Sequence, residues 1–140
     1  MILFALSFTG EAGPKIFEGV RLPTKPDDGA PVVVGKAYDF VLWLLPKVET
    51  FPRSHRFTIG ERLSAQGLDV LVILTEAAYT SGKDDLLTQA NRKINSTRLL
   101  LRLSKDLRLL SLDAYAFAAE RLDEIGRMVG GWRRASGPRK

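Results

Sequence analysis

Residues 84–109 read DDLLTQANRKINSTRLLLRLSKDLRL, and the spacing of their leucines says most about the architecture. Two acidic residues open the stretch, where they suit the positively polarised first turn of a helix. The apolar residues recur at helical spacing but fall into two arcs of the helical wheel. One arc holds Leu87, Ala90, Ile94 and Leu101, and the other holds Leu99, Leu103, Leu107 and Leu110. The stretch predicts a helix with two apolar faces.

One apolar face of such a helix can line the core of a bundle, and the other needs a second cover. The preceding helical stretch also has apolar residues outside its main stripe, namely Ala65, Leu68 and Val72. Self-association would cover the second faces with a neighbouring subunit. The alternative is a wide core face within one bundle.

Three other stretches also have the helical period. From Gly35 onward, Tyr38, Val41, Leu42 and Leu45 form one stripe, which Pro46 should kink or end. Phe51-Pro52 indicates a new start, and the next stripe comprises Leu63, Gly67, Val70, Leu71, Leu74 and Ala78. Ser111 suits the N-cap of a last helix, whose stripe comprises Tyr115, Ala119, Leu122, Ile125, Val129 and Trp132. Four helices with short connections predict an all-α fold, an antiparallel up-down four-helix bundle.

The first 31 residues differ from the rest in their density of proline and glycine, which disfavours a helix. We expect an N-terminal extension of uncertain order over residues 1–31, the four-helix domain over 32–135 and a basic C-terminal tail over 136–140. A partly ordered tail is one form for the extension. The other is a hairpin or docking strand, with Ile16–Leu22 and Val32–Val34 as extended pieces. Gly130-Gly131 predicts fraying near the end of the last helix.

Composition narrows the chemistry further. The 140 residues contain no cysteine and one histidine, His55, which excludes thiolate catalysis and multi-histidine metal sites. No apolar run approaches the 20 or so residues of a membrane span, so we expect a cytoplasmic protein without a membrane partner. The formal net charge of +5 favours an acidic partner such as a nucleic acid or another protein.

The positive charge is concentrated on the third predicted helix. Residues 92–108 include six basic side chains against the single acid Asp106: Arg92, Lys93, Arg98, Arg102, Lys105 and Arg108. Arg98, Arg102 and Lys105 share one face, which Asn91 and Asn95 extend, and such a file can track phosphates. Arg53, His55 and Arg56 form a further cluster. A solvated surface, or pairing with acids of neighbouring helices, explains the same charges equally well.

Other features point away from specific readout or catalysis. Phe57, Tyr115, Phe117 and Trp132 have spacings that suit a core, so the sequence predicts no aromatic stacking platform. Asp84-Asp85 and Asp123-Glu124 are adjacent carboxylates, which point to different helix faces. No phosphate loop, nucleophile elbow or zinc motif is present. We therefore expect no catalytic residue, no metal and no cofactor, and we expect Gly126 and Gly130 to mark close helix packing.

Three phrases resemble a known family: FPRSHRFTIGERL at residues 51–63, LLLRLSKDLRLLS at 99–111 and LDEIGRMVGGWRR at 122–134. Together they are similar to the Avd family, the accessory proteins of diversity-generating retroelements. That family is related to the four-helix proteins of intervening sequences in 23S rRNA genes. The resemblance covers about residues 32–134, and the N-terminal 31 residues depart from it.

The resemblance implies a bundle that assembles as a barrel-like homopentamer and is not itself a catalyst. It implies binding to RNA or DNA and to the retroelement reverse transcriptase, in support of mutagenic copying of template RNA into cDNA. The nucleic-acid role is carried first onto Arg98 and Arg102, then onto Lys105 and Arg108, and by resemblance alone onto Arg53 and Arg56. The alternative is a related RNA-binding or assembly protein without a polymerase partner.

Overall fold

A computed structural model describes residues 30–136 of the chain. Four long helices follow one another: α3 (Ala30–Glu49), α5 (Glu61–Ala78), α6 (Asp84–Asp106) and α7 (Leu112–Ser136). Between α3 and α5 lie one short turn, α4 (Arg53–His55), and a π-helical turn, η2 (Arg56–Gly60). Residues 30–136 contain no strand.

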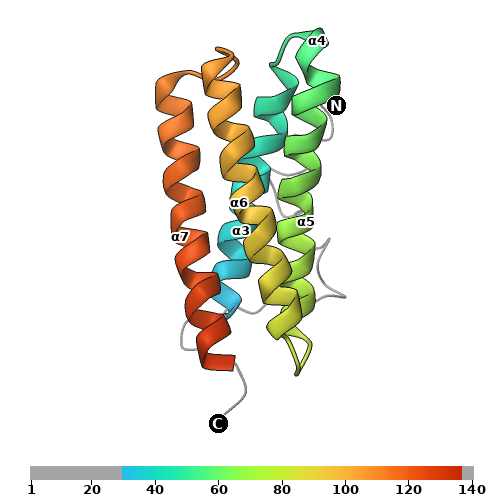
Figure 1. Cartoon of the computed structure of the whole chain (residues 1–140), viewed down its shortest axis with the longest axis vertical. Coiled ribbons are helices and arrows are strands. Elements are labelled where there is room, and N and C mark those ends of the chain that lie inside the picture. The colour runs from blue at the N-terminus through green and yellow to red at the C-terminus, as the bar shows by residue number, and fades with distance from the viewer. Residues whose placement is uncertain (1–29, 137–140) are drawn as a thin grey trace, which may run out of the picture.

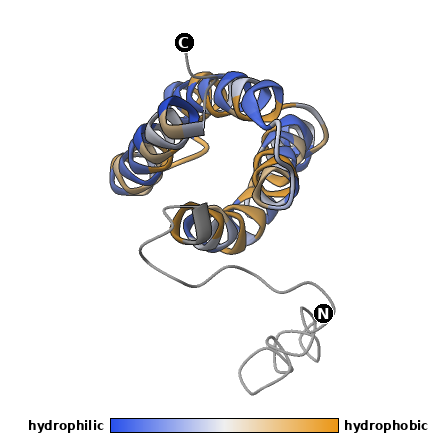
Figure 2. Ribbon diagram, turned by 90° about the horizontal axis from the view of Figure 1, so that it is seen from below, coloured by the Kyte–Doolittle hydropathy of each residue, from blue (hydrophilic) through white to orange (hydrophobic). Residues whose placement is uncertain are grey.

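The four long helices run alternately up and down and are joined by short connections (Figure 1). Each helix packs against the one before it in the chain, and α7 closes the bundle by returning to α3. Viewed along the bundle, the helices surround a common centre (Figure 2). The prediction of an antiparallel four-helix bundle is confirmed for the described residues.

The core is apolar along its length, and every long helix contributes to it. Its largest fully buried side chains include Phe51, Leu44, Leu63, Leu74, Leu87, Ile94, Leu101, Leu122 and Ile125. Two buried polar residues, Thr97 and Ser104, interrupt the apolar stripe of α6. Their hydroxyls donate to the carbonyl oxygens of Lys93 and Leu100, one turn earlier in the same helix. Both groups are thereby satisfied without a partner from another helix.

The two leucine arcs of α6 separate as the sequence predicts. Leu87, Ala90, Ile94 and Leu101 are buried in the core. Leu99, Leu103 and Leu107 face outward, and Leu99 is 65% exposed. Leu110, predicted to belong to the outward arc, is instead buried, because α6 ends at Asp106 rather than near residue 109. The outward-facing Leu68 and Val72 of α5 give that helix a second apolar face too.

The first helix differs most from its prediction. Val32–Val34, expected to be extended if ordered, lies inside α3, while Ile16–Leu22 lies outside the described residues. Of the four residues predicted as its core stripe, only Val41 is buried. The buried stripe instead comprises Val33, Val34, Ala37, Phe40, Val41, Leu44 and Val48.

Pro46 does not end α3, which continues to Glu49. Proline removes the hydrogen bond that a backbone N–H would give to the carbonyl four residues earlier. Here that carbonyl belongs to Leu42, and both residues lie on the exposed face of the helix. The unpaired carbonyl therefore faces solvent, where its loss of a partner matters least.

The last helix begins as predicted and ends later. The backbone N–H of Ala114 donates to Ser111 Oγ at 3.0 Å, which confirms Ser111 as the N-cap of α7. The helix then passes through Gly130-Gly131 to Ser136, so the predicted fraying at these glycines is wrong for the described chain. Val129 and the partly buried Trp132 pack on the core from either side of them, which holds this turn in place.

Candidate nucleic-acid interface

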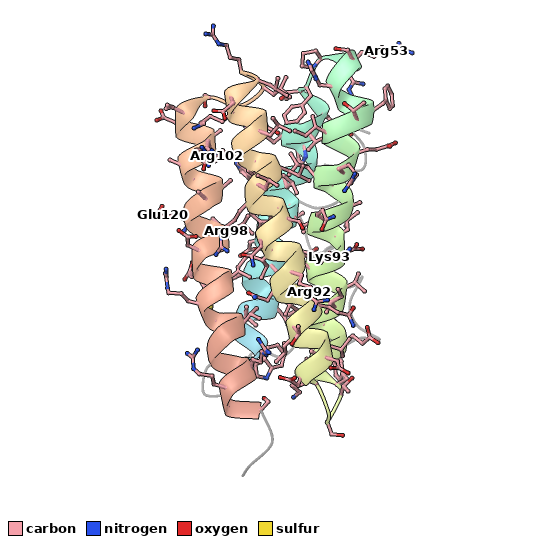
Figure 3. All side chains as sticks on the ribbon, in the orientation of Figure 1. Arg53, Arg92, Lys93, Arg98, Arg102 and Glu120 are labelled. Carbon is pink, nitrogen blue, oxygen red and sulfur yellow. The ribbon has the colours of Figure 1, made fainter. Side chains whose placement is uncertain are left out.

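Basic side chains from two separate connections gather at one end of the bundle. The α4–η2 segment and the turn between α6 and α7 both lie at the upper end of Figure 1. The first carries Arg53 and Arg56, and the second carries Arg108, all three of which are exposed. We call these three residues the arginine end. Arg98 and Arg102 lie lower, along the side of α6 that faces α7 (Figure 3).

The Arg98 side chain forms bonds across the contact between α6 and α7. Its Nε lies 3.2 Å from Asp123 Oδ1, its Nη1 donates to Asn95 Oδ1, and its Nη2 reaches the Leu122 carbonyl. The guanidinium also lies over Gly126, where a Cβ atom would come within 2.8 Å of Nη2. Gly126 thus marks close packing as predicted, whereas a Cβ at Gly130 would meet only ordinary contacts.

Arg98→Ala should therefore lower the free energy of unfolding by about 1–2 kcal/mol, because it removes three hydrogen bonds and the cover over Gly126. Arg102→Ala, one turn further along the same helix, should change it by less than about 0.5 kcal/mol. Urea unfolding followed by circular dichroism measures both. If the two variants changed the free energy of unfolding equally, Arg98 would not stabilise the contact between α6 and α7.

Arg102 and Arg108 remain available to a ligand. Both side chains are exposed, and no ion pair joins either of them to a carboxylate among residues 30–136. Lys105 is less available, since its Nζ lies 4.8 Å from the centre of the Tyr115 ring and 3.4 Å from Asp106 Oδ1. The predicted file therefore divides into Arg98, which bonds to α7, the partly engaged Lys105 and the free Arg102. Arg108 lies after the end of α6.

Arg108 occupies a backbone position that normally takes glycine. It follows the last turn of α6 with a φ of 65°, in the left-handed region. The Arg108 N–H bonds the Lys105 carbonyl and the Leu109 N–H bonds the Ser104 carbonyl, at 2.9 and 2.8 Å. This pair of bonds is the Schellman motif, in which the left-handed residue is most often glycine. An arginine here is less stable than a glycine would be, and its exposed cation lies at the end of the bundle.

Arg108→Gly should raise the free energy of unfolding by about 1 kcal/mol, because glycine adopts this conformation without steric strain. The same change should weaken binding of a polyanion by removing one phosphate contact. Chemical unfolding and fluorescence anisotropy give the two quantities on one sample. A less stable variant would show that the arginine side chain stabilises the turn through contacts of its own.

The α4–η2 segment presents an aromatic ring with its arginines. The Cζ atoms of Arg53 and Arg56 lie 6.0 and 5.9 Å from the centre of the Phe57 ring. Phe57 is 57% exposed, so its expected place in the core is wrong. In a π-helical turn the residue spacing per turn widens, and Ile59 and Gly60 take the buried positions instead.

The remaining basic residues have mixed environments. Lys93 pairs with Asp69 at 3.0 Å, and Arg133 pairs with Asp84 at 3.1 Å. Pairing with acids of neighbouring helices, the alternative explanation of the charge, thus accounts for part of it. His55 is half-buried beside the two arginines of its segment. No group of three potential metal ligands occurs within residues 30–136, and no helix in that range has the length and apolarity needed to cross a membrane.

Comparison with known proteins identifies the family. The model of a family described as bAvd-like matches residues 31–136, which is more than half of the chain. No curated protein and no solved structure shows significant similarity. The matched range contains all four long helices except for the first residue of α3. The resemblance carried by the three sequence phrases is thereby confirmed, and the chain belongs to the bAvd-like family.

Proposed function

We propose that this protein is a non-catalytic accessory protein of a diversity-generating retroelement. In this role it binds the template RNA or cDNA and the retroelement reverse transcriptase, and it supports mutagenic reverse transcription. Membership of the bAvd-like family supports the accessory role. The observation that carries the nucleic-acid part is that four of the six predicted site residues are exposed and form no ion pair with a carboxylate of residues 30–136: Arg53, Arg56, Arg102 and Arg108.

Phosphate groups are the ligands that such a surface favours. An arginine that keeps its charge exposed and unpaired can exchange a condensed counterion for a phosphate oxygen, and each exchange adds to the salt dependence of binding. Planar guanidinium groups also match phosphate geometry in two-pronged hydrogen bonds. Two of these arginines lie on α4–η2, one on α6 and one in the turn after α6, so a strand that contacted all four would cross both connections.

Self-assembly as a homopentamer is part of the proposal. The outward leucines of α6 and the outward Leu68 and Val72 of α5 are large apolar groups with no cover inside one bundle. Faces of this kind normally mark contacts between proteins. The number of subunits, five, comes from the family resemblance. The surface proposed for the contact between subunits comes from the exposed apolar residues.

The first test is a salt titration of binding to RNA, to DNA and to an RNA–DNA hybrid by fluorescence anisotropy. We expect affinity to fall steeply with salt, with a logarithmic slope that decreases by about 0.7–0.9 for each phosphate-contacting arginine replaced by glutamine. Arg98→Gln serves as the matched control, since Arg98 is held by Asp123 and Asn95. If the protein shows no binding even at about 50 mM salt, the nucleic-acid part of the proposal is wrong.

The polymerase contact needs a separate test. Co-expression with a reverse transcriptase of a diversity-generating retroelement, followed by affinity capture and size-exclusion chromatography with light scattering, reports the complex and its stoichiometry. A stable complex is the expected result. A protein that binds structured RNA but captures no polymerase would instead match the alternative, an RNA-binding or assembly protein of the 23S rRNA intervening-sequence type.

A further inference from the structure

Phe57 is an exposed aromatic residue at the arginine end, and two arginines lie next to its ring. More than half of its surface is open to solvent. Arg53 and Arg56 lie within about 6 Å of its ring centre, which is the range of cation–π attraction. Neither arginine forms an ion pair with a carboxylate of residues 30–136. The result is an exposed aromatic ring with two guanidinium groups over it, neither of which is paired with a carboxylate of residues 30–136.

The turn that carries Phe57 is held firmly in place. Phe51 before it and Ile59 after it are 2% and 7% exposed, so the segment is anchored in the core on both sides. Gly60 lies so close to α3 that a Cβ atom would be 3.0 Å from Val48 Cγ1. The Arg56 N–H donates to the Pro52 carbonyl at 2.9 Å. The exposure of the ring is therefore a property of the fold and not of a loosely attached loop.

The π-helical turn is what directs the ring outward. Thr58 Oγ1 donates to the His55 carbonyl at 3.2 Å, on the exposed side of the turn. Ile59 and Gly60 occupy the inward positions. Insertions of this kind into helices occur frequently at functional sites. Here the turn leaves the phenyl ring exposed, with the guanidinium groups of Arg53 and Arg56 over it.

We propose that Phe57 stacks on an unpaired base of a single-stranded nucleic acid while Arg53 and Arg56 contact the flanking phosphates. This inference rests on the proposed function and narrows it, because the ligand at the arginine end is then a single strand and not a duplex. Bases inside a duplex are already stacked on their neighbours, so their faces are closed to a side chain. Single strands are bound by this combination of an aromatic face and a basic groove.

Charge complementarity selects a nucleic acid over a protein partner here. An apolar protein surface on Phe57 would have to desolvate two guanidinium groups that have no carboxylate partner, which is unfavourable. A nucleotide offers a π-face to the ring and anionic oxygens to the arginines at once. The planar guanidinium groups also stack on bases themselves.

The test compares Phe57→Leu with Phe57→Trp by fluorescence anisotropy. The probes are a labelled oligonucleotide of about 12 nucleotides, as RNA and as DNA, and the duplex of each. Phe57→Leu should weaken single-strand binding by about 5- to 150-fold, which corresponds to the usual value of one base–aromatic stack. Its salt slope should stay at the wild-type value, because both arginines remain. Phe57→Trp should retain wild-type affinity, and duplex binding should be unaffected by either change.

Leu112→Ala is the matched control. Leu112 is an equally exposed apolar residue, at 64%, at the same end of the bundle. Its replacement should leave single-strand affinity within about twofold of wild type. Thermal unfolding of all three variants should match the wild type, since neither side chain is buried.

Each other outcome has a distinct meaning. If the wild-type protein binds single strands but Phe57→Leu binds them equally well, the stacking inference is wrong and the proposed function stands. If Phe57→Leu changes the oligomer mass measured by light scattering, a second copy of the chain covers the ring and the inference is again wrong. If the wild type binds neither strands nor duplexes, the nucleic-acid role itself is lost, and the inference with it.

Discussion

Leu101→Ala should lower the free energy of unfolding by about 2–5 kcal/mol, the usual cost of emptying a fully buried leucine site. Leu101 is 1% exposed and faces the bundle core. Leu103, two residues later on the same helix, is 45% exposed, and Leu103→Ala should change the stability of one bundle by less than about 0.5 kcal/mol. Urea unfolding at low protein concentration separates the two effects.

In a measurement of self-assembly, Leu103→Ala should have the larger effect of the two variants. Leu103→Ala removes apolar surface from the outward face, so it should shift the oligomer toward smaller species in light scattering. Leu101→Ala should assemble normally at temperatures where it is folded. An oligomer that is insensitive to Leu103, Leu99 and Leu107 would show that subunits meet elsewhere.

Gly67→Val should lower the free energy of unfolding by about 3 kcal/mol, because α3 and α5 touch at this position. A Cβ atom at Gly67 would lie 2.7 Å from Leu44 Cδ2. Leu44 is 1% exposed, so its side chain cannot turn out into solvent to make room. A valine would therefore separate the two helices or force a strained rotamer.

Gly35→Val is the control for this substitution. Gly35 is also inside a helix, α3, but a Cβ there would meet nothing within 4 Å. Valine has a better helix propensity than glycine, so the variant should be as stable as the wild type or slightly more stable. If both variants lost stability equally, the cost would arise from the helix backbone and not from the contact with Leu44.

The sequence predicts α5, α6 and α7 well because each has a clear apolar stripe that faces the core, even though α5 and α6 also have a second, outward apolar face. Ser111 is a sharp start signal, and the leucine arcs of α6 separate as predicted except for Leu110, which lies beyond the end of the helix. The stripe of α3 could not be assigned in the same way, since apolar residues occur almost all round this helix and several registers fit them equally. Only packing against the other helices selects Leu44 over Leu42.

The candidate interface is less predictable than the fold, because spacing along one helix does not show what the neighbouring helix offers. Arg98 and Arg102 are equivalent in the sequence, one turn apart, yet only Arg98 lies opposite Asp123 and Gly126. Phe57 reads as a core residue until the π-helical turn moves its position on the wheel. The left-handed conformation of Arg108 has no sequence signal, since the residue usually found there is glycine.

The arginine end and the end of α7 lie at opposite ends of the bundle, which has a practical consequence for measurements on an immobilised protein. The described chain ends at Ser136, at the lower end of α7 in Figure 1, and the arginine end is at the opposite pole. A linker that follows α7 can therefore anchor the protein to a sensor chip or a bead with Arg53, Phe57 and Arg108 pointing into the flow cell. Oriented in this way, an immobilised bundle should report the same affinities as the free molecule.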